Sequence, residues 1–227
     1  MDAIDAHPTI SVDAWFDARC PWCYIGKVRL DRAVAHYRAK YAGAEVLIRH
    51  RSFLLAPDMP PRYSGGEAEY LHEFEGVPVE QARWSLPAIE RVAAAEDIPL
   101  RFDGLQLVST WPIHRLFQFA EERGRGEALL EQVFVAYFDE QRDLASREVL
   151  GELAARAGLD AAGAAAAADD ATWDTAIKRE WRRAQMLGVN GVPYFLFNAT
   201  YEIRGAIDTA AFERGLERIR ELELARS

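Results

Sequence analysis

Residues 17–30 read DARCPWCYIGKVRL and contain both cysteines of the chain, Cys20 and Cys23. The stretch before them, ISVDAWF at 10–16, is β-branched and aromatic with rough alternation, which predicts a strand. After the cysteines, apolar residues recur at helical spacing, which predicts a helix. The cysteine pair is therefore expected at a strand-to-helix junction.

The rest of the chain continues this alternation of strands and helices. A strand is predicted at 45–53 (EVLIRHRSF), and LLAPDMPPRYSGG then predicts a long loop. In order there follow helical patterns from 67 to 188, strands at 192–198 (VPYFLFN) and 201–206 (YEIRGA), and an amphipathic helix ending in ERIRELEL.

The order of these elements predicts an α/β fold, β-α-β followed by β-β-α, with a large all-helical insertion between the two halves. We divide the chain into a first half at 1–66, a helical insertion domain at 67–188 and a second half at 189–227. A sheet built in this way carries helices on its faces.

Composition excludes some partners and suggests a compartment. The formal net charge of −9 argues against nucleic acid and against an anionic membrane surface. The sequence shows neither a secretory signal nor a membrane-spanning run, so we expect a cytoplasmic protein. In that reducing compartment a close cysteine pair is more often catalytic or metal-binding than a permanent disulfide.

The strand-to-helix position suits dithiol chemistry. A thiolate of Cys20 at the helix start would be stabilised by unpaired backbone N–H groups and by the helix dipole, and Arg19 would add positive charge. Cys23 lies almost one helical turn deeper, where it can act as the resolving thiol. Pro21 fits the first helical position, and Trp22 offers an apolar docking surface.

Two other interpretations of the pair remain open on the residues alone. One is half of a zinc site, completed by histidines drawn from His7, His36, His50, His72 and His114, although none of these form a close His pair in the sequence. The other is two inert buried thiols. We expect no metal.

The chain resembles a known family in six segments. They are CPWCYIGKVRL, HRSFLLAPDMP, HRLFQFA, VFVAYFDE, GVNGVPYFLFN and YEIRGA, of which CPWCYIG and GVPYF are the most specific. Together they resemble the DsbA-like thioredoxin oxidoreductases, particularly the bacterial FrnE-type branch. Ala56, where an asparagine is common, and STWPI before His114 depart from the family pattern.

The resemblance implies a thioredoxin fold with a helical insertion and a redox-active site at Cys20 and Cys23. It also implies a cis proline at Pro193, with the backbone of Val192 pairing with substrate, and makes His114 a further candidate for substrate binding. The implied partners are protein or small-molecule thiols and disulfides. No cofactor is expected beyond the Cys20–Cys23 disulfide, with glutathione a candidate co-substrate and a homodimer a candidate assembly.

Two alternatives to dithiol exchange follow from the same fold. The kappa-class glutathione transferases and hydroxychromene-carboxylate isomerases share it but typically have serine where this chain has Cys20. The retained pair favours dithiol exchange over such a glutathione-dependent isomerase or transferase. A non-catalytic thioredoxin-fold binding module is the third hypothesis.

Overall fold

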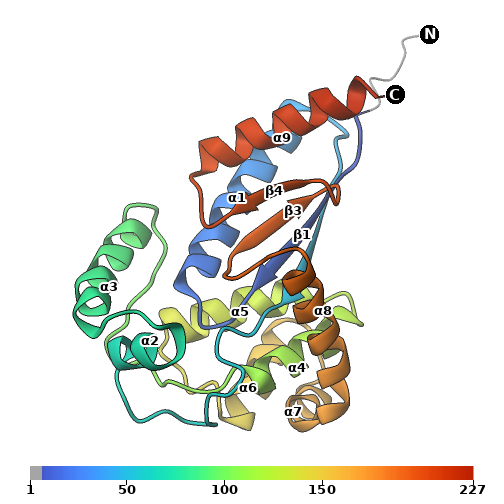
Figure 1. The fold of residues 1–227 in the computed structure, drawn as a ribbon. Coiled ribbons are helices and arrows are strands. Elements are labelled where there is room, and N and C mark those ends of the chain that lie inside the picture. The colour runs from blue at the N-terminus through green and yellow to red at the C-terminus, as the bar shows by residue number, and fades with distance from the viewer. Residues whose placement is uncertain (1–6, 227) are drawn as a thin grey trace.

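Figure 1 shows the computed structural model of the chain, which describes residues 7–226. Its elements in chain order are β1 (Ile10–Phe16), α1 (Pro21–Lys40), β2 (Val46–Ser52), α2 (Glu67–Glu75), α3 (Val79–Ala94), α4 (Trp111–Glu121), α5 (Gly126–Phe138), α6 (Arg147–Arg156), α7 (Ala161–Asp169), a 3₁₀ turn η1 (Ala171–Trp173), α8 (Asp174–Met186), β3 (Tyr194–Phe197), β4 (Tyr201–Arg204) and α9 (Thr209–Leu224).

The four strands form one mixed sheet in the order β2-β1-β3-β4. β1 runs parallel to β2 and antiparallel to β3, so that Val12 lies between Ile48 and Phe197 in the register. Two parallel neighbours need a crossover, and α1 supplies it. The predicted order β-α-β, helices, β-β-α is confirmed.

Each face of the sheet is covered by helices (Figure 1). α1 and α9 pack side by side on one face, over a core that contains Val12, Leu30 and Phe212. On the other face Trp15 and Tyr194 pack against α8, and the Trp15 indole N–H donates to the carbonyl of Glu180 at 3.1 Å. The fully buried indole thus has its one donor satisfied.

The helical insertion builds its core directly against the cysteine pair. Cys20 and Cys23 belong to the same buried apolar cluster as residues of α4 and α5. The ring of Tyr24 stacks on that of Phe134, with centroids 5.2 Å apart. The insertion therefore forms the rear wall of the cysteine site as well as a helical block of its own.

Element boundaries follow the sequence closely, with three physical corrections. β3 spans Tyr194–Phe197 rather than 192–198, because only these residues pair with β1. β2 ends at Ser52 because the ladder pairs it with Phe16, where β1 itself ends. β4 ends at Arg204, two residues earlier than predicted, because Gly205 has a φ of 79°, outside the strand region. All three strands are shorter than predicted because pairing and backbone angle, rather than residue type, end them.

Candidate active site

Cys20 is placed by the start of α1. It is the N-cap residue, with extended backbone angles (φ −79°, ψ 112°), and Pro21 occupies the first helical position. The carbonyl of Asp17 accepts the Cys20 N–H at 3.1 Å, and the Cys20 carbonyl accepts the Cys23 N–H at 3.0 Å. The predicted strand-to-helix junction is confirmed, and a thiolate at this position faces the positive end of the helix.

The two cysteines are free thiols at different depths. Cys20 is 5% exposed and lines an open cleft, whereas Cys23 is 3% exposed and lies behind it against Phe16 and Phe134. Burial, followed by the hydrogen bond and charge of Cys20, raises the pKa of Cys23 well above its ordinary value. Cys23 is thus a protonated thiol at neutral pH, and Cys20 is the sulfur that a substrate can reach.

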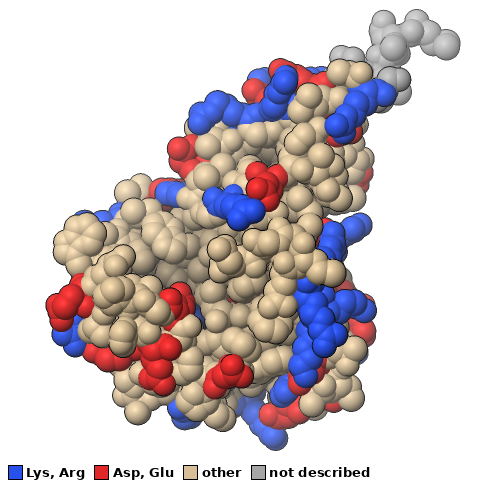
Figure 2. Space-filling view, in the orientation of Figure 1, with Lys and Arg blue, Asp and Glu red and all other residues tan. Residues whose placement is uncertain are grey.

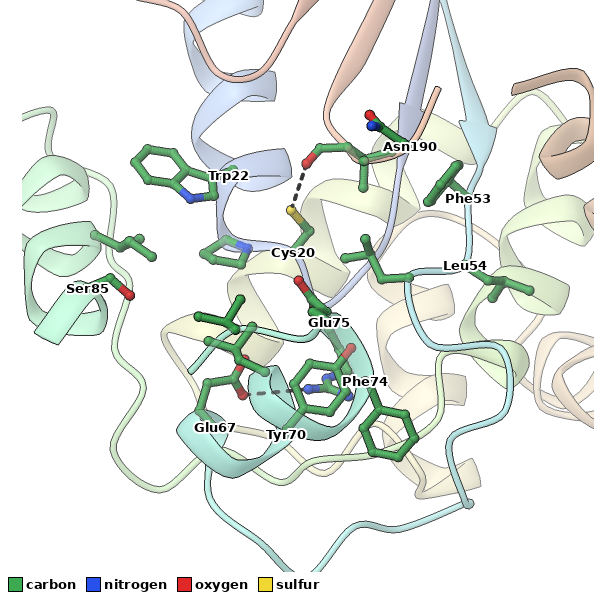
Figure 3. Close-up of a pocket in the computed structure, with 18 of the residues that line it drawn as sticks. Cys20, Trp22, Phe53, Leu54, Glu67, Tyr70, Phe74, Glu75, Ser85 and Asn190 are labelled. Carbon is green, nitrogen blue, oxygen red and sulfur yellow. Dashed lines mark hydrogen bonds and ion pairs between the residues drawn. The ribbon is translucent and has the colours of Figure 1, made fainter. Parts of the chain in front are cut away.

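The loop before β3 faces Cys20. The Val192–Pro193 peptide bond is cis, as the resemblance implied, and the Cys20 Sγ donates to the Val192 carbonyl at 3.4 Å (Figure 3). A Cβ atom on Gly26 would lie 3.0 Å from the Cγ of Pro193 and 3.3 Å from the Cζ of Phe195. Gly26 therefore allows α1 to approach this loop closely.

Asp17 ties the cysteine turn to the rest of the molecule. Its buried carboxylate accepts hydrogen bonds from the N–H groups of Arg19 and Leu55, both at 3.0 Å, and from the Thr110 hydroxyl at 3.2 Å. Burial acts to raise the pKa of Asp17, but the nearby His114 imidazole and these backbone donors hold it below its ordinary value. The ionised side chain joins β1, the loop after β2 and the start of α4.

His114 lies beneath the cysteine turn and not in the cleft. It is fully buried, its Nδ1 lies 3.1 Å from the Ser52 hydroxyl, and its Nε2 lies 4.0 Å from the Asp17 carboxylate. His114 is not among the residues that line the cleft in front of Cys20. Its contacts place it beside Asp17 in the support of the turn, so a direct contact with substrate gains no support from this position.

A charged group also lies behind Cys23. Lys27, on the same helix, is buried and donates to Asp31 at 2.6 Å. Burial and the nearby Lys27 charge lower the pKa of His50 to about 3, so its imidazole is neutral at physiological pH. Lys27 and His50 border the small apolar space that Cys23 faces.

The cleft in front of Cys20 has a volume of about 740 Å³. Trp22, which is 36% exposed, and Val192 border it on the cysteine side, and α2, α3 and α8 form its other walls (Figure 3). Its lining is largely apolar, with Phe53 and Phe74 among the larger side chains. This cleft therefore brings together three predicted site residues, Cys20, Trp22 and Val192. The fourth, Pro193, lines the small space behind Cys23 instead.

Arg19, expected to add positive charge beside Cys20, is enclosed at the floor of the cleft. Its guanidinium lies 3.8 Å from the Tyr70 ring centre, donates to the Tyr137 hydroxyl, and forms an ion pair with Glu67 at 3.6 Å. Burial raises the pKa of Glu67 to about 7, against the opposing effect of Arg19. The Arg19 charge is therefore shared with Glu67 rather than directed at Cys20 alone.

Residues 7–226 contain neither a cluster of metal-ligating side chains nor a helix that could span a membrane. No group of three or more His, Cys, Asp or Glu side chains within residues 7–226 is arranged to hold a metal ion, so the zinc interpretation gains no ligand set. No helix in that range is long and apolar enough to cross a membrane.

The fold and the site together define the class of protein. A Cys-Pro-Trp-Cys pair at the start of a helix, opposite a cis proline on a mixed sheet, is the arrangement of a thioredoxin-fold protein with a dithiol site. Residues 11–217 match the DSBA-like thioredoxin domain. The chain belongs to this family.

Solved structures agree with this assignment. The chain is 36% identical to a probable DsbA oxidoreductase, SCO1869, from Streptomyces coelicolor, with a TM-score of 0.80 over 92% of this chain and 89% of that one. It is 22% identical to the cytosolic disulfide reductase DsbM from Pseudomonas aeruginosa, with a TM-score of 0.64 over 96% and 100% of the two chains. A 2-hydroxychromene-2-carboxylate isomerase shares the fold at 17% identity, with a TM-score of 0.70 over 96% and 99%.

Sequence reasoning missed the residues that surround the cysteines without being close to them in sequence. Glu67 and Tyr70 come from a helix whose orientation the periodicity does not fix. Asp17 could have been found, because an aspartate that directly follows a buried strand and precedes a turn often accepts local backbone N–H groups.

Proposed function

We propose that the protein is a thiol-disulfide oxidoreductase that acts through Cys20 and Cys23. The main support is their placement: the Cys20 Sγ borders an open cleft at the start of α1, and Cys23 lies directly behind it. The Val192 carbonyl, 3.4 Å from the Cys20 Sγ, is a backbone group that an extended substrate can meet beside the sulfur. A thiolate, a partner thiol and a docking edge are the three requirements of exchange.

Reduction of a substrate disulfide would take two steps. The Cys20 thiolate attacks one substrate sulfur, which breaks the substrate S–S bond, forms a mixed disulfide and releases the other sulfur as a thiolate that takes up a proton. Cys23 then loses its proton and attacks the Cys20 sulfur, which releases the second substrate thiolate. Two electrons pass to the substrate, and the enzyme is left with a Cys20–Cys23 disulfide. Oxidation of a dithiol substrate is the reverse.

Protein or small-molecule disulfides are the proposed substrates, and the cytoplasm the proposed compartment. The P. aeruginosa neighbour is described as a cytosolic disulfide reductase and has also been solved with GSH. This supports a reducing role here, with glutathione as a co-substrate that regenerates the dithiol.

Two cysteine variants test the proposal. Cys20→Ser should abolish insulin reduction, because it removes the attacking sulfur. Cys23→Ser should accumulate a mixed disulfide with substrate, which mass spectrometry of acid-quenched samples detects. Circular dichroism spectra check that both variants fold. Full insulin reduction by the Cys20→Ser variant would refute the proposal, and no insulin reduction by the wild type would favour a binding module.

A glutathione-dependent isomerase is the second candidate, because a 2-hydroxychromene-2-carboxylate isomerase has the same fold. Such a reaction needs no resolving thiol. Two results together would favour the isomerase. The wild type would show no disulfide exchange, and glutathione-dependent isomerisation of 2-hydroxychromene-2-carboxylate would persist in the Cys23→Ser variant.

A further inference from the structure

Two buried polar atoms at the floor of the cleft have no hydrogen-bond partner. They are the Arg19 Nη2 and the Glu67 Oε2, which lie 3.6 Å apart on side chains that are 3% and 9% exposed. Both side chains line the cleft that contains Cys20. Buried polar groups are nearly always hydrogen-bonded in folded proteins, so this pair points to a polar group that completes it.

The Glu67 side chain is the less enclosed of the two, at 9% exposed against 3% for Arg19. The Arg19 guanidinium is covered on one face by the Tyr70 ring, and its other nitrogens donate to the Tyr137 hydroxyl and to the sulfur of Met59. Glu67 has no hydrogen bond from a described residue to its Oε2 beyond the long ion pair. The enclosed guanidinium is thus the less available partner, and the Glu67 carboxylate the more available one, for a group in the cleft.

A second carboxylate lies on the same side of the cleft. Glu75 is exposed at the carbonyl end of α2, and Figure 3 shows its carboxylate pointing from α2 toward Cys20. It forms no ion pair with any residue the structure describes. Partial desolvation, and then repulsion by Asp17, raise its pKa.

Above the Glu67 pKa of about 7, the charges that line the cleft are thus unbalanced toward negative. Arg19, Glu67 and Glu75 are the charged side chains in its described lining, and the single cation is the most enclosed of the three. In Figure 2 acidic side chains also gather over α2, whereas the basic ones gather over α8 on the opposite side of the view. A cation near Cys20 would be bound more strongly than an anion.

We propose that this cleft selects disulfides that carry an ammonium or guanidinium group beside the reacting sulfur, with Glu67 and Glu75 as its receptors. The inference rests on the proposed exchange at Cys20 and names the substrate class of that site. The cation pairs with the Glu67 carboxylate, which otherwise faces only Arg19, and takes a second contact from Glu75. Either a basic peptide or a small amine disulfide has this chemistry.

Three small disulfides of different charge test the proposal. They are cystamine, which is cationic, bis(2-hydroxyethyl) disulfide, which is neutral, and dithiodiglycolate, which is anionic. Oxidation of the reduced protein by each is followed by stopped-flow tryptophan fluorescence, and each rate is divided by the rate of the same reagent with free dithiothreitol. We expect cystamine to exceed dithiodiglycolate by about tenfold, which matches two weak, partly exposed ion pairs.

Charge-neutralising variants locate the effect. Glu75→Gln should reduce that ratio about threefold, and Glu67→Gln should reduce it as well. Glu73→Gln, on the same helix but outside the cleft lining, is the matched control. Because Glu67→Gln leaves Arg19 buried without its anion, Glu75→Gln is the variant that decides if Glu67→Gln fails to fold.

The outcomes separate this inference from the proposed function. No reaction with any of the three disulfides would overturn the exchange at Cys20 itself. Equal normalised rates, or the same change in Glu73→Gln as in Glu75→Gln, would overturn the charge selection alone. Disulfide peptides flanked by Lys or by Glu then identify the source: a Lys preference indicates a peptide substrate, and a preference confined to cystamine indicates a small amine.

Discussion

Replacement of Asp17 by asparagine tests how the cysteine turn is held. The carboxylate accepts two backbone N–H groups and the Thr110 hydroxyl in a buried position. In Asp17→Asn one oxygen becomes an NH₂ group, which faces a backbone N–H and leaves it without an acceptor. An orphaned buried donor costs about 1–3 kcal/mol, and the remaining hydrogen bonds lose their charge assistance.

The expected loss of unfolding free energy is therefore about 2–4 kcal/mol, which a chain of this size can lose and remain folded. Equilibrium urea unfolding followed by circular dichroism should show a midpoint lowered by about 1 M, with an unchanged slope. Asp58→Asn is the matched control, because Asp58 is exposed and forms no hydrogen bond or ion pair with a described residue. That variant should unfold as the wild type does.

The pH dependence gives this prediction a sign. The pKa of Asp17 is lowered in the folded state, so its contribution to stability is complete above its ordinary pKa of about 3.9. It is lost as the pH falls through the lower folded-state pKa, where the wild type also becomes protonated. The difference between wild type and Asp17→Asn should be full at pH 7 and shrink below pH 4. An equal difference at pH 7 and pH 3.5, or none at pH 7, would refute the reasoning.

Three further predictions concern the surroundings of the cysteines. Gly26→Ala should slow disulfide exchange several-fold, because the new Cβ displaces the Pro193 loop. The free energy of unfolding should change by less than about 1 kcal/mol, because the helix gains propensity. Stopped-flow kinetics measures the exchange rate and urea unfolding the stability, and an unchanged exchange rate would contradict the prediction. The raised pKa of Cys23 predicts that the mixed disulfide on Cys20 resolves faster as pH rises from 6 to 9, since the thiolate attacks; a flat profile in quenched-flow samples would contradict this. The pKa of His50 is lowered to about 3 in the folded state, so its contribution to stability is complete above its unfolded pKa of about 6.5 and is lost as the pH falls toward 3. The free energy of unfolding of His50→Gln should therefore fall less than that of the wild type over this pH range. An identical fall would argue against a neutral buried His50.

The sequence was sufficient for the fold because its signals are local. Alternation placed β1 at 10–16, where the structure has it, and the glycines that follow the ends of α4, α6 and α8, at 124, 158 and 188, all have positive φ. Positive φ favours glycine over any residue with a Cβ, so such positions can be recognised without tertiary information. Cys20 and Cys23 were found for a similar reason, because both the spacing and the strand-to-helix junction are short-range features.

The surroundings of the cysteines could not be predicted, because they depend on contacts far apart in sequence. Arg19 was expected to add positive charge beside Cys20, but that its guanidinium would be enclosed by Met59, Tyr70 and Tyr137 was not foreseeable. A helical histidine such as His114 gives no periodicity signal for whether it faces a cleft or a core. In the structure it contacts Ser52 and approaches Asp17, which no spacing in the sequence relates to it.

The two parts of the chain contribute differently to the site. The strand-helix unit at the start of the chain and the loop before β3 supply the sulfur atoms and the Val192 carbonyl. The insertion supplies Glu67 and Glu75 on α2, together with Thr110 at the start of α4. Exchange needs only a thiolate, a second thiol and a docking edge. Substitutions in the insertion can therefore alter the charge of the cleft while disulfide exchange at Cys20 is retained. Substitutions in α2 should therefore alter which disulfides react, whereas substitutions at the cysteine turn should alter whether any react.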